Sequence, residues 1–135
     1  MTPEEKINYR LIPNKAEMWS DKDGISWLVF ADESDIEEAD IKMISEFAVL
    51  YDPSGVKFLV LVDIRNISMI SPSARNLASS SETEKISRAI AIVASSPATK
   101  LIANFFIRFH RPRVPTKIFT SPNEAKNWLL TFERV

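Results

Sequence analysis

The chain has 135 residues, the usual size of one domain, and we expect a single domain over residues 1–135. Apolar residues make up 45% and charged residues 26% of the sequence, which places the chain among ordinary globular proteins, and the net charge of −1 gives no indication of nucleic-acid binding. The absence of cysteine excludes disulfides, zinc–thiolate sites and thiol nucleophiles.

The N-terminal sequence MTPEEKINYR carries acidic residues where a signal peptide needs a basic and then an apolar stretch. No apolar run in the sequence approaches the roughly 20 residues that a membrane-spanning helix needs. We therefore expect a cytoplasmic protein without a transmembrane segment.

The first half of the sequence predicts a β-meander followed by a helix. Over residues 5–31 apolar residues alternate with polar ones, and a break at Pro13 predicts a turn between strands. From Ser34 the apolar period changes to three or four residues, which predicts an amphipathic helix that begins with a Ser34/Glu37 capping box and ends at residues 52–55. Its expected apolar face consists of Ile36, Ala39, Met43, Phe47 and Leu50.

The second half of the sequence predicts three strand–helix units. Strands are expected at residues 56–62, 89–94 and 116–119. Helices are expected at residues 72–83, 97–110 and 122–133. The first two strands are continuous apolar runs, typical of strands covered on both faces in a largely parallel sheet. The expected fold class is α/β, with the meander followed by repeated strand–helix units and four helices on a mixed, largely parallel sheet.

Three of the predicted helices begin with the same dipeptide, at Ser71-Pro72, Ser96-Pro97 and Ser121-Pro122. A serine at the N-cap accepts a hydrogen bond from an otherwise unpaired backbone N–H, and proline is tolerated at the first helical position. The repetition favours a capping role for Ser71 over a nucleophilic one.

The sequence offers few residues for catalysis or metal binding. The two glycines, Gly24 and Gly55, fall in predicted turns, so phosphate loops and dinucleotide fingerprints are excluded. The single histidine, His110, has arginine neighbours and no adjacent carboxylate to orient it as a base. Asp21 and Asp23 have the spacing of a calcium loop, but the first and last carboxylates are missing, which favours a hairpin turn. We expect no catalytic residue, no metal and no cofactor.

The helix predicted at residues 97–110 has an apolar face that covers more than half of its circumference, more than a helix on one side of a sheet needs. The candidate interface or apolar ligand face consists of Ile102, Phe105, Phe106 and Phe109. The basic patch beside it consists of Arg108, Arg111 and Arg113.

Three explanations of this face remain open. Other parts of the chain could cover it, it could bind a protein partner or a second copy, or it could contact a membrane surface or a lipid. Residues 32–52 are strongly acidic, so acidic and basic surfaces on one molecule would permit a self-complementary contact.

The order of elements, with a loop of the form D-x-x-x-x-x-x-x-S-P-S-A before the second helix, resembles the STAS domain of bacterial anti-sigma-factor antagonists. The segment LIANFFIRFHRPRVPTKIFTSPNEAKNWL resembles more closely the SpoIIAA-like proteins of uncharacterised function. The resemblance covers about residues 25–133 and implies the SpoIIAA-like fold.

In the antagonists, a kinase phosphorylates the second serine of a D-S-S-G motif after the central strand. Aligned on Asp63, that motif places Ser73 at the phosphoacceptor and Ala74 at the glycine. The resemblance thus implies a site formed by Asp63 and Ser73. A phosphate on Ser73 would lie in the first turn of a helix, where unpaired N–H groups favour negative charge.

Three hypotheses about function follow. The first is a non-catalytic regulatory or protein-interaction module, either a homodimer or bound to a protein partner. The second is a protein that binds a lipid or another apolar small molecule between the sheet and the helix carrying Phe105, Phe106 and Phe109. The third, an enzyme, has the least support in the residue types present.

Overall fold

A computed structural model describes residues 6–51, 57–78, 87–110 and 113–132, without the side chains of residues 48–51 and 109–110. The strands are β1 (Ile7–Ile12), β2 (Ala16–Ser20), β3 (Ile25–Phe30), β4 (Ser34–Ile36), β5 (Phe58–Asp63), β6 (Ile67–Ile70), β7 (Ser87–Val93) and β8 (Thr116–Phe119). The helices are α1 (Glu38–Tyr51), α2 (Pro72–Ala78), α4 (Pro97–Phe105) with a π-helical turn η2 (Phe106–His110), and α5 (Pro122–Leu129).

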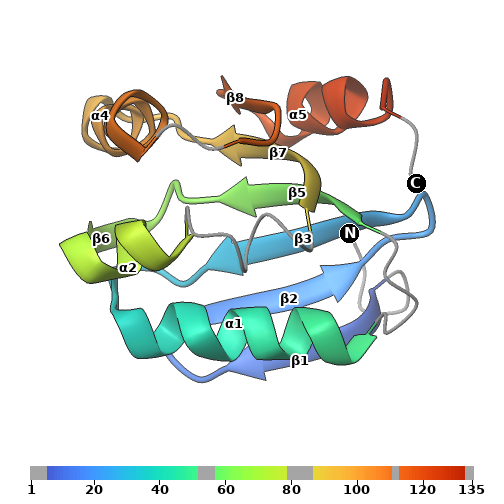
Figure 1. Cartoon of the computed structure of the whole chain (residues 1–135), viewed down its shortest axis with the longest axis horizontal. Helices are drawn as coiled ribbons and strands as arrows, with labels where there is room; N and C mark the ends of the chain where they lie inside the picture. Colours follow the sequence, from blue (N-terminus) through green and yellow to red (C-terminus); the bar gives the residue numbers. More distant parts are fainter. Residues whose placement is uncertain (1–5, 52–56, 79–86, 111–112, 133–135) are drawn as a thin grey trace.

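Six of the strands form one mixed sheet in the order β1-β2-β3-β5-β7-β8 (Figure 1). The first three strands are antiparallel neighbours, which confirms the predicted meander. From β3 onwards every neighbouring pair is parallel, because each connection returns over a face of the sheet. The predicted α/β class and the largely parallel sheet are confirmed.

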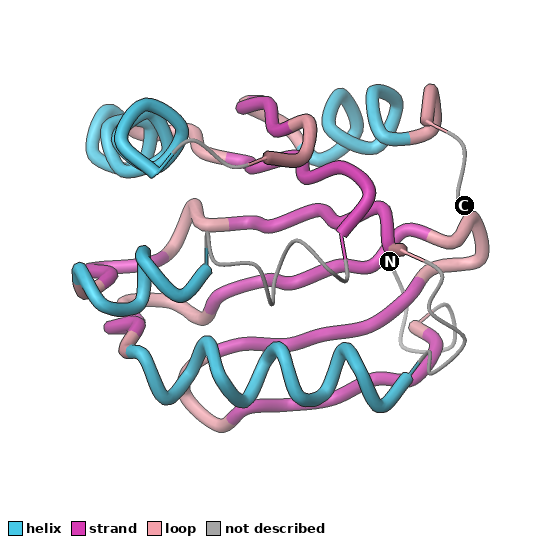
Figure 2. Tube along the Cα trace, in the orientation of Figure 1, coloured by secondary structure: helices cyan, strands magenta, loops and turns pink. Residues whose placement is uncertain are grey.

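Helices cover both faces of this sheet (Figure 2). On one face, α1, α2 and α4 enclose a large apolar cluster with residues such as Leu28, Ile90 and Ala103. On the other face, α5 packs on β5 and β7 through Ala125 and Leu129. Alternate residues of each central strand therefore contact different helices, as their continuous apolar sequences predict.

The sequence did not predict β4 and β6, which pair in parallel as a separate small sheet. Ser34 lies within β4, and its buried hydroxyl makes no hydrogen bond to any described residue. The predicted Ser34/Glu37 capping box is therefore wrong. Instead α1 begins at Glu38, and the backbone N–H of Glu37 donates to Asp40 Oδ2 over 2.8 Å.

The later start of α1 also changes its buried face. Ile41 is buried and Ile44 packs against the same cluster, whereas Met43, expected to face the core, is 42% exposed. Ile36 is buried, but as part of β4. Only Phe47 of the predicted helical stripe packs on the core from α1 among the residues whose side chains are described.

The three remaining helices begin where the sequence predicts. Residues 79–83 of the second predicted helix lie outside the described residues. The third predicted helix is α-helical to Phe105 and continues as the wider turn η2, which departs from the regular helical spacing. The fourth ends at Leu129, followed by a turn, and is shorter than expected.

Candidate functional site

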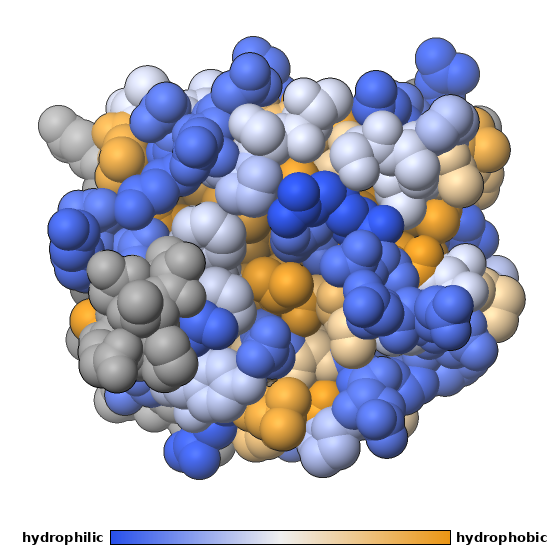
Figure 3. Space-filling model, turned by 180° about the vertical axis from the view of Figure 1, so that it is seen from behind, coloured by the Kyte–Doolittle hydropathy of each residue, from blue (hydrophilic) through white to orange (hydrophobic). Residues whose placement is uncertain are grey.

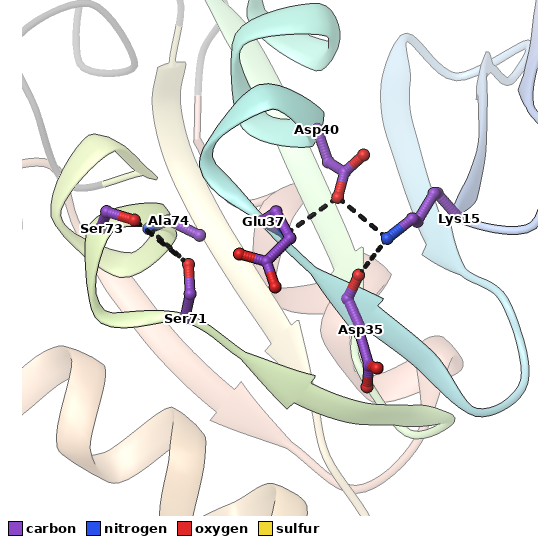
Figure 4. A network of polar contacts seen from close by, with 7 residues as sticks. All are labelled: Lys15, Asp35, Glu37, Asp40, Ser71, Ser73 and Ala74. Carbon is purple, nitrogen blue, oxygen red and sulfur yellow. Dashed lines mark hydrogen bonds and ion pairs between the residues drawn. The ribbon is translucent and has the colours of Figure 1, made fainter.

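The N-terminal end of α2 holds the serine that the family resemblance singles out (Figure 4). Ser71 Oγ accepts a hydrogen bond from the backbone N–H of Ala74 over 3.1 Å, so Ser71 caps the helix as predicted. Ser73 is exposed, and its Oγ lies 3.3 Å from Ser71 Oγ. Ser73 is thus an exposed residue in the first turn of α2.

Asp63 lies at the end of β5 and is 3% exposed. Its carboxylate forms an ion pair with Arg65, with Oδ2 2.7 Å from the guanidinium nitrogen Nη2, and accepts the Arg65 backbone N–H at Oδ1 over 3.1 Å. Hydrogen bonding to Asp63 raises the pKa of Arg65 although burial opposes it. These contacts give Asp63 a structural role in turning the chain after β5.

The structure places Asp63 and Ser73 on different sides of the sheet. The side chain of Asp63 points to the same face as Leu59 and Leu61, which pack with α5. Ser73 is the second residue of α2, which covers the opposite face. No hydrogen bond or ion pair joins the two residues in the part of the chain that the structure describes.

A polar network near Ser73 holds the acidic N-terminal end of α1 (Figure 4). Lys15 Nζ lies 3.3 Å from Asp40 Oδ2 and also donates to the backbone carbonyl of Asp35. The backbone N–H of Ser71 donates to the carbonyl of Ile36 over 2.9 Å and so ties α2 to β4. The starts of α1 and α2 therefore form one connected region.

The predicted aromatic face of residues 97–110 divides between the core and the surface. Ile102 and Phe106 pack against the core cluster beneath α4. Leu101 is 71% exposed and Phe105 is 37% exposed. The side chain of Phe109 lies outside the described residues. Two of the four residues of the predicted face, Ile102 and Phe106, therefore pack in the protein interior. Phe105 is partly exposed to solvent.

The predicted basic patch is described only in part. Arg108 on η2 and Arg113 after it are exposed, while Arg111 lies outside the described residues. A further arginine, Arg75 of α2, was not part of the prediction. Its guanidinium carbon lies 4.5 Å from the ring centroid of Phe105, so it connects α2 with α4 by a cation–π contact.

A cavity of about 180 Å³ lies between the sheet and the layer of α1, α2 and α4. Its sheet side includes residues of β3, β5 and β7, and the opposite side includes residues from all three helices. Characteristic lining residues are Val60, Val62, Ile90, Ile92, Ile102 and Phe106. The second hypothesis placed a ligand in this space. Of the three predicted residues whose side chains are described, Ile102 and Phe106 line it and Phe105 does not.

Few polar residues line the cavity. Ser20 and Ser26 are direct partners across β2 and β3, and Ser87 is the first residue of β7. Ser45 of α1 and Arg75 of α2 complete the polar set among the described residues. Arg75 could have been noticed in the sequence, because it is the only charged residue between Arg65 and Glu82.

Asp21 is a second buried carboxylate, and it lies on the α5 side. It is 4% exposed and accepts hydrogen bonds from the backbone N–H of Ile25 over 3.0 Å and from Trp27 Nε1 over 2.9 Å. The Nζ atom of Lys126 on α5 lies 3.1 Å from Asp21 Oδ2 and 2.7 Å from Asp23 Oδ2. Burial favours a higher pKa, but the hydrogen bonds from Trp27 and Ile25 and the charge of Lys126 lower the pKa of Asp21.

This arrangement agrees with the predicted hairpin turn between β2 and β3. The contacts of Asp21 and Asp23 connect the turn to α5. No group of three or more potential ligands that could hold a metal ion occurs in the described parts of the chain. No helix within the described ranges is long and apolar enough to cross a membrane.

Comparison with solved structures gives the SpoIIAA-like fold. An uncharacterized protein of the DUF3478 family from Shewanella loihica PV-4, described as having that fold, matches 84% of this chain and 91% of its own chain, with a TM-score of 0.62 and 13% identity. The anti-sigma factor antagonist SpoIIAA in its unphosphorylated form matches 92% of this chain and 97% of its own, with a TM-score of 0.50 and 9% identity. The resemblance inferred from the sequence is confirmed at the level of the fold.

Searching the curated proteins gives no match. The sequence model of one family, described as Domain of unknown function (DUF7793), matches residues 18–133. Because this match spans most of the chain, the protein belongs to the DUF7793 family.

Proposed function

We propose that this domain is a non-catalytic binding module that takes up an apolar small molecule between the sheet and the layer of α1, α2 and α4. The cavity of about 180 Å³ carries this proposal. Protein interiors pack as densely as organic crystals and contain few voids larger than a water molecule. An engineered apolar cavity of about 150 Å³ binds benzene or xenon, so the space here is sufficient for an apolar group of that size.

The energetic argument supports an occupant. At about 24 cal/mol per Å³, an empty space of about 180 Å³ corresponds to about 4 kcal/mol of missing packing, a large part of the stability of an ordinary domain. The walls are formed mainly by aliphatic and aromatic side chains, which offer water few partners. An apolar ligand would restore contacts that neither the described residues nor water supplies.

Binding of hexan-1-ol, which is close to benzene in size, tests this function. Native mass spectrometry should show a 1:1 complex, and the melting temperature should rise with the alcohol concentration. Val60→Phe fills part of the cavity from β5 and should abolish the complex without unfolding the domain. Leu11→Phe adds the same ring on the exposed edge strand β1 and serves as the matched control. Equal binding by the wild type and Val60→Phe would place the alcohol elsewhere and contradict the proposal.

A second candidate function is the one that the sequence favours first, a regulatory or protein-interaction module. Two exposed features support it: Ser73 in the first turn of α2, and the apolar side chains of Leu101 and Phe105 on α4. Arg75 connects the two helices through its contact with Phe105. Modification of Ser73 and binding at α4 would therefore act on neighbouring elements.

A homodimer through α4 is the most direct form of this candidate. Light scattering should then give a dimer mass for the wild type and a monomer mass for Leu101→Asp, which introduces charge at a side chain 71% exposed. Phe106 is unsuitable for this test because it lines the interior cavity. Asn104→Asp, on the same helix and exposed, is the control for added charge. A monomeric wild type would exclude the homodimer.

Phosphorylation of Ser73 needs its own measurement. Intact-protein and peptide mass spectrometry of the protein from its native cells should locate a phosphate on Ser73, and Ser73→Ala should remove it. Only unmodified Ser73 under varied growth conditions would count against the regulatory form of this candidate.

A further inference from the structure

The polar residues that line the cavity are not spread evenly over its sheet side. Residues that pair across neighbouring strands form rows on this face, because alternate residues of a strand point to the same side. One row is entirely apolar and consists of Met18, Leu28, Val62 and Ile92. The next row consists of Ser20, Ser26, Val60 and Ile90. Two serines therefore lie side by side on β2 and β3 at one end of an apolar wall.

A third serine lies at the same end, on β7. Ser87 is only 2% exposed and pairs with Phe58, the first residue of β5. The pairing is irregular after this point, and the next two residues both face α5. Ala89 belongs to the cluster on that side, and the guanidinium carbon of Arg88 lies 5.4 Å from the ring centroid of Phe132 in the same cluster. Ser87 consequently lies on the cavity side. We call these three residues the serine end of the cavity: Ser20, Ser26 and Ser87.

The charged residue of the lining lies at the other end. In Figure 1 the strands β3, β5 and β7 point toward the end of the sheet beside α2, which carries Arg75. Ser87 begins β7 and Ser26 is the second residue of β3, so the serine end lies where these strands start. None of the described lining residues at this end is charged. Because a buried ion needs a compensating charge, this end favours an uncharged group.

Serine hydroxyls are suited to recognise another hydroxyl. Each offers one donor and two acceptor positions, so it can pair with a ligand hydroxyl even where it already makes a hydrogen bond. A hydroxyl buried without a partner is costly, and a hydrogen bond to a neutral group removes most of that cost. The serine end can therefore select a polar group that the apolar row beside it would reject.

We propose that the cavity binds a small uncharged molecule with one hydroxyl group, such as a phenol or a short alcohol. The hydroxyl lies at the serine end and the apolar body lies against Val62 and Ile92. This inference rests on the proposed apolar binding function and specifies its ligand class. A space of about 180 Å³ limits the ligand to about the size of a substituted benzene. Rows on one face are about 7 Å apart, so a molecule of this size would reach from the serine end to the apolar row.

Phenol and toluene form a matched pair of probes, because they share the ring and differ only in a hydroxyl or a methyl group. Phenol is uncharged at pH 7, since phenolic hydroxyls ionise near about pH 10. A cavity without hydrogen-bond partners should bind toluene about tenfold more tightly, because phenol would lose its hydrogen bonds to water. Methyl NMR titrations of the wild type should instead show phenol binding at least as tightly as toluene, with shifted signals from Val62 and Ile92.

Serine substitutions test where the hydroxyl is recognised. Ser26→Ala combined with Ser87→Ala removes hydroxyls on both sides of β5 and should move the preference toward toluene by about tenfold, equivalent to about 1.4 kcal/mol. The affinity of this double variant for toluene should remain near that of the wild type. Ser45→Ala is the matched control, because it removes the same oxygen from the cavity wall formed by α1, and it should keep the wild-type preference. An equal shift in Ser45→Ala and the double variant would overturn the inference.

The remaining outcomes separate the inference from the function on which it rests. Tighter binding of toluene than of phenol by the wild type would overturn the hydroxyl specificity and leave the apolar site intact. Equal weakening of both probes in the double variant would assign the serines a packing role and also overturn the inference. Binding of neither probe by the wild type would overturn the proposed function itself.

Discussion

The two faces of the sheet differ in how closely their helices approach it. On the α5 face, Ala89 and Ala91 of β7 meet Ala125 of α5, and all three are fully buried. Small side chains on both elements allow the helix to pack directly on the strands. On the other face three helices cover a broader area and leave a cavity of about 180 Å³. We call the α5 side the closed face and the side that contains the cavity the open face, and the same strands form both.

The α5 side of the sheet also carries exposed apolar residues at its edge strand β1. Figure 3 views the molecule from behind and shows apolar surface between hydrophilic side chains. Tyr9 and Leu11 of β1 are 43% and 57% exposed, and Tyr9 donates to Glu17 on the face opposite α1. On the same face Trp19 of β2 is buried and stacks on Trp27 of β3. The exposed apolar side chains therefore lie at the edge strand β1, away from α5.

The largest predicted effect is a difference between large-to-small substitutions on the two faces. Leu129→Ala removes a fully buried side chain of α5 and should lower the free energy of unfolding by about 3–5 kcal/mol. Ile44→Ala on α1 removes a partly buried side chain that already borders the cavity, and should cost about half as much. Urea denaturation of both variants measures the difference. Equal costs would mean that the open face is as closely packed as the closed one.

The second prediction concerns Asp21, which joins the β2–β3 turn to α5. Its pKa is lowered in the folded state, so its contribution to stability is present above the unfolded pKa of about 3.9 and is lost as the pH falls through the lower folded value. Asp21→Asn should lower the free energy of unfolding by about 1–3 kcal/mol at pH 7. Below about pH 4 the variant should lose less stability than the wild type does. Urea denaturation across this pH range provides the measurement.

Asp32→Asn is the control for the loss of a carboxylate, because Asp32 is exposed in a turn. It should leave the free energy of unfolding at pH 7 within about 0.5 kcal/mol of the wild type. If Asp21→Asn and the wild type lost stability in parallel below pH 4, Asp21 would not be the group that couples the closed face to pH.

Much of the fold follows from the sequence because its signals are local. The apolar runs ending at Val62 and starting at Ala89 predict buried parallel strands, and each Ser-Pro pair marks a helix start. β4 and β6 were missed because each is short, and their pairing joins segments about 30 residues apart. The buried face of α1 was misassigned for a related reason, since Ile36 belongs to this strand pair and not to the helix.

The candidate site was harder to predict. A cavity is a small difference between the volume that the backbone encloses and the volume that side chains fill, and no local pattern records it. The alternation of Tyr9 and Leu11 predicts a strand correctly but not its burial, because β1 lies at the edge of the sheet. The family resemblance predicted a site formed by Ser73 and Asp63. In the structure Asp63 lies on the opposite face of the sheet and forms an ion pair with Arg65.

The smallest predicted effects compare two neighbouring serines on the open face. Ser71→Ala removes the hydroxyl that accepts the Ala74 N–H at the start of α2 and should cost about 1 kcal/mol of unfolding free energy. Ser73→Ala changes an exposed side chain and should stay within about 0.5 kcal/mol of the wild type. Both are measured by urea denaturation. A cost for Ser73→Ala equal to that for Ser71→Ala would give Ser73 a structural role and remove the reason to regard it as a residue kept available for modification.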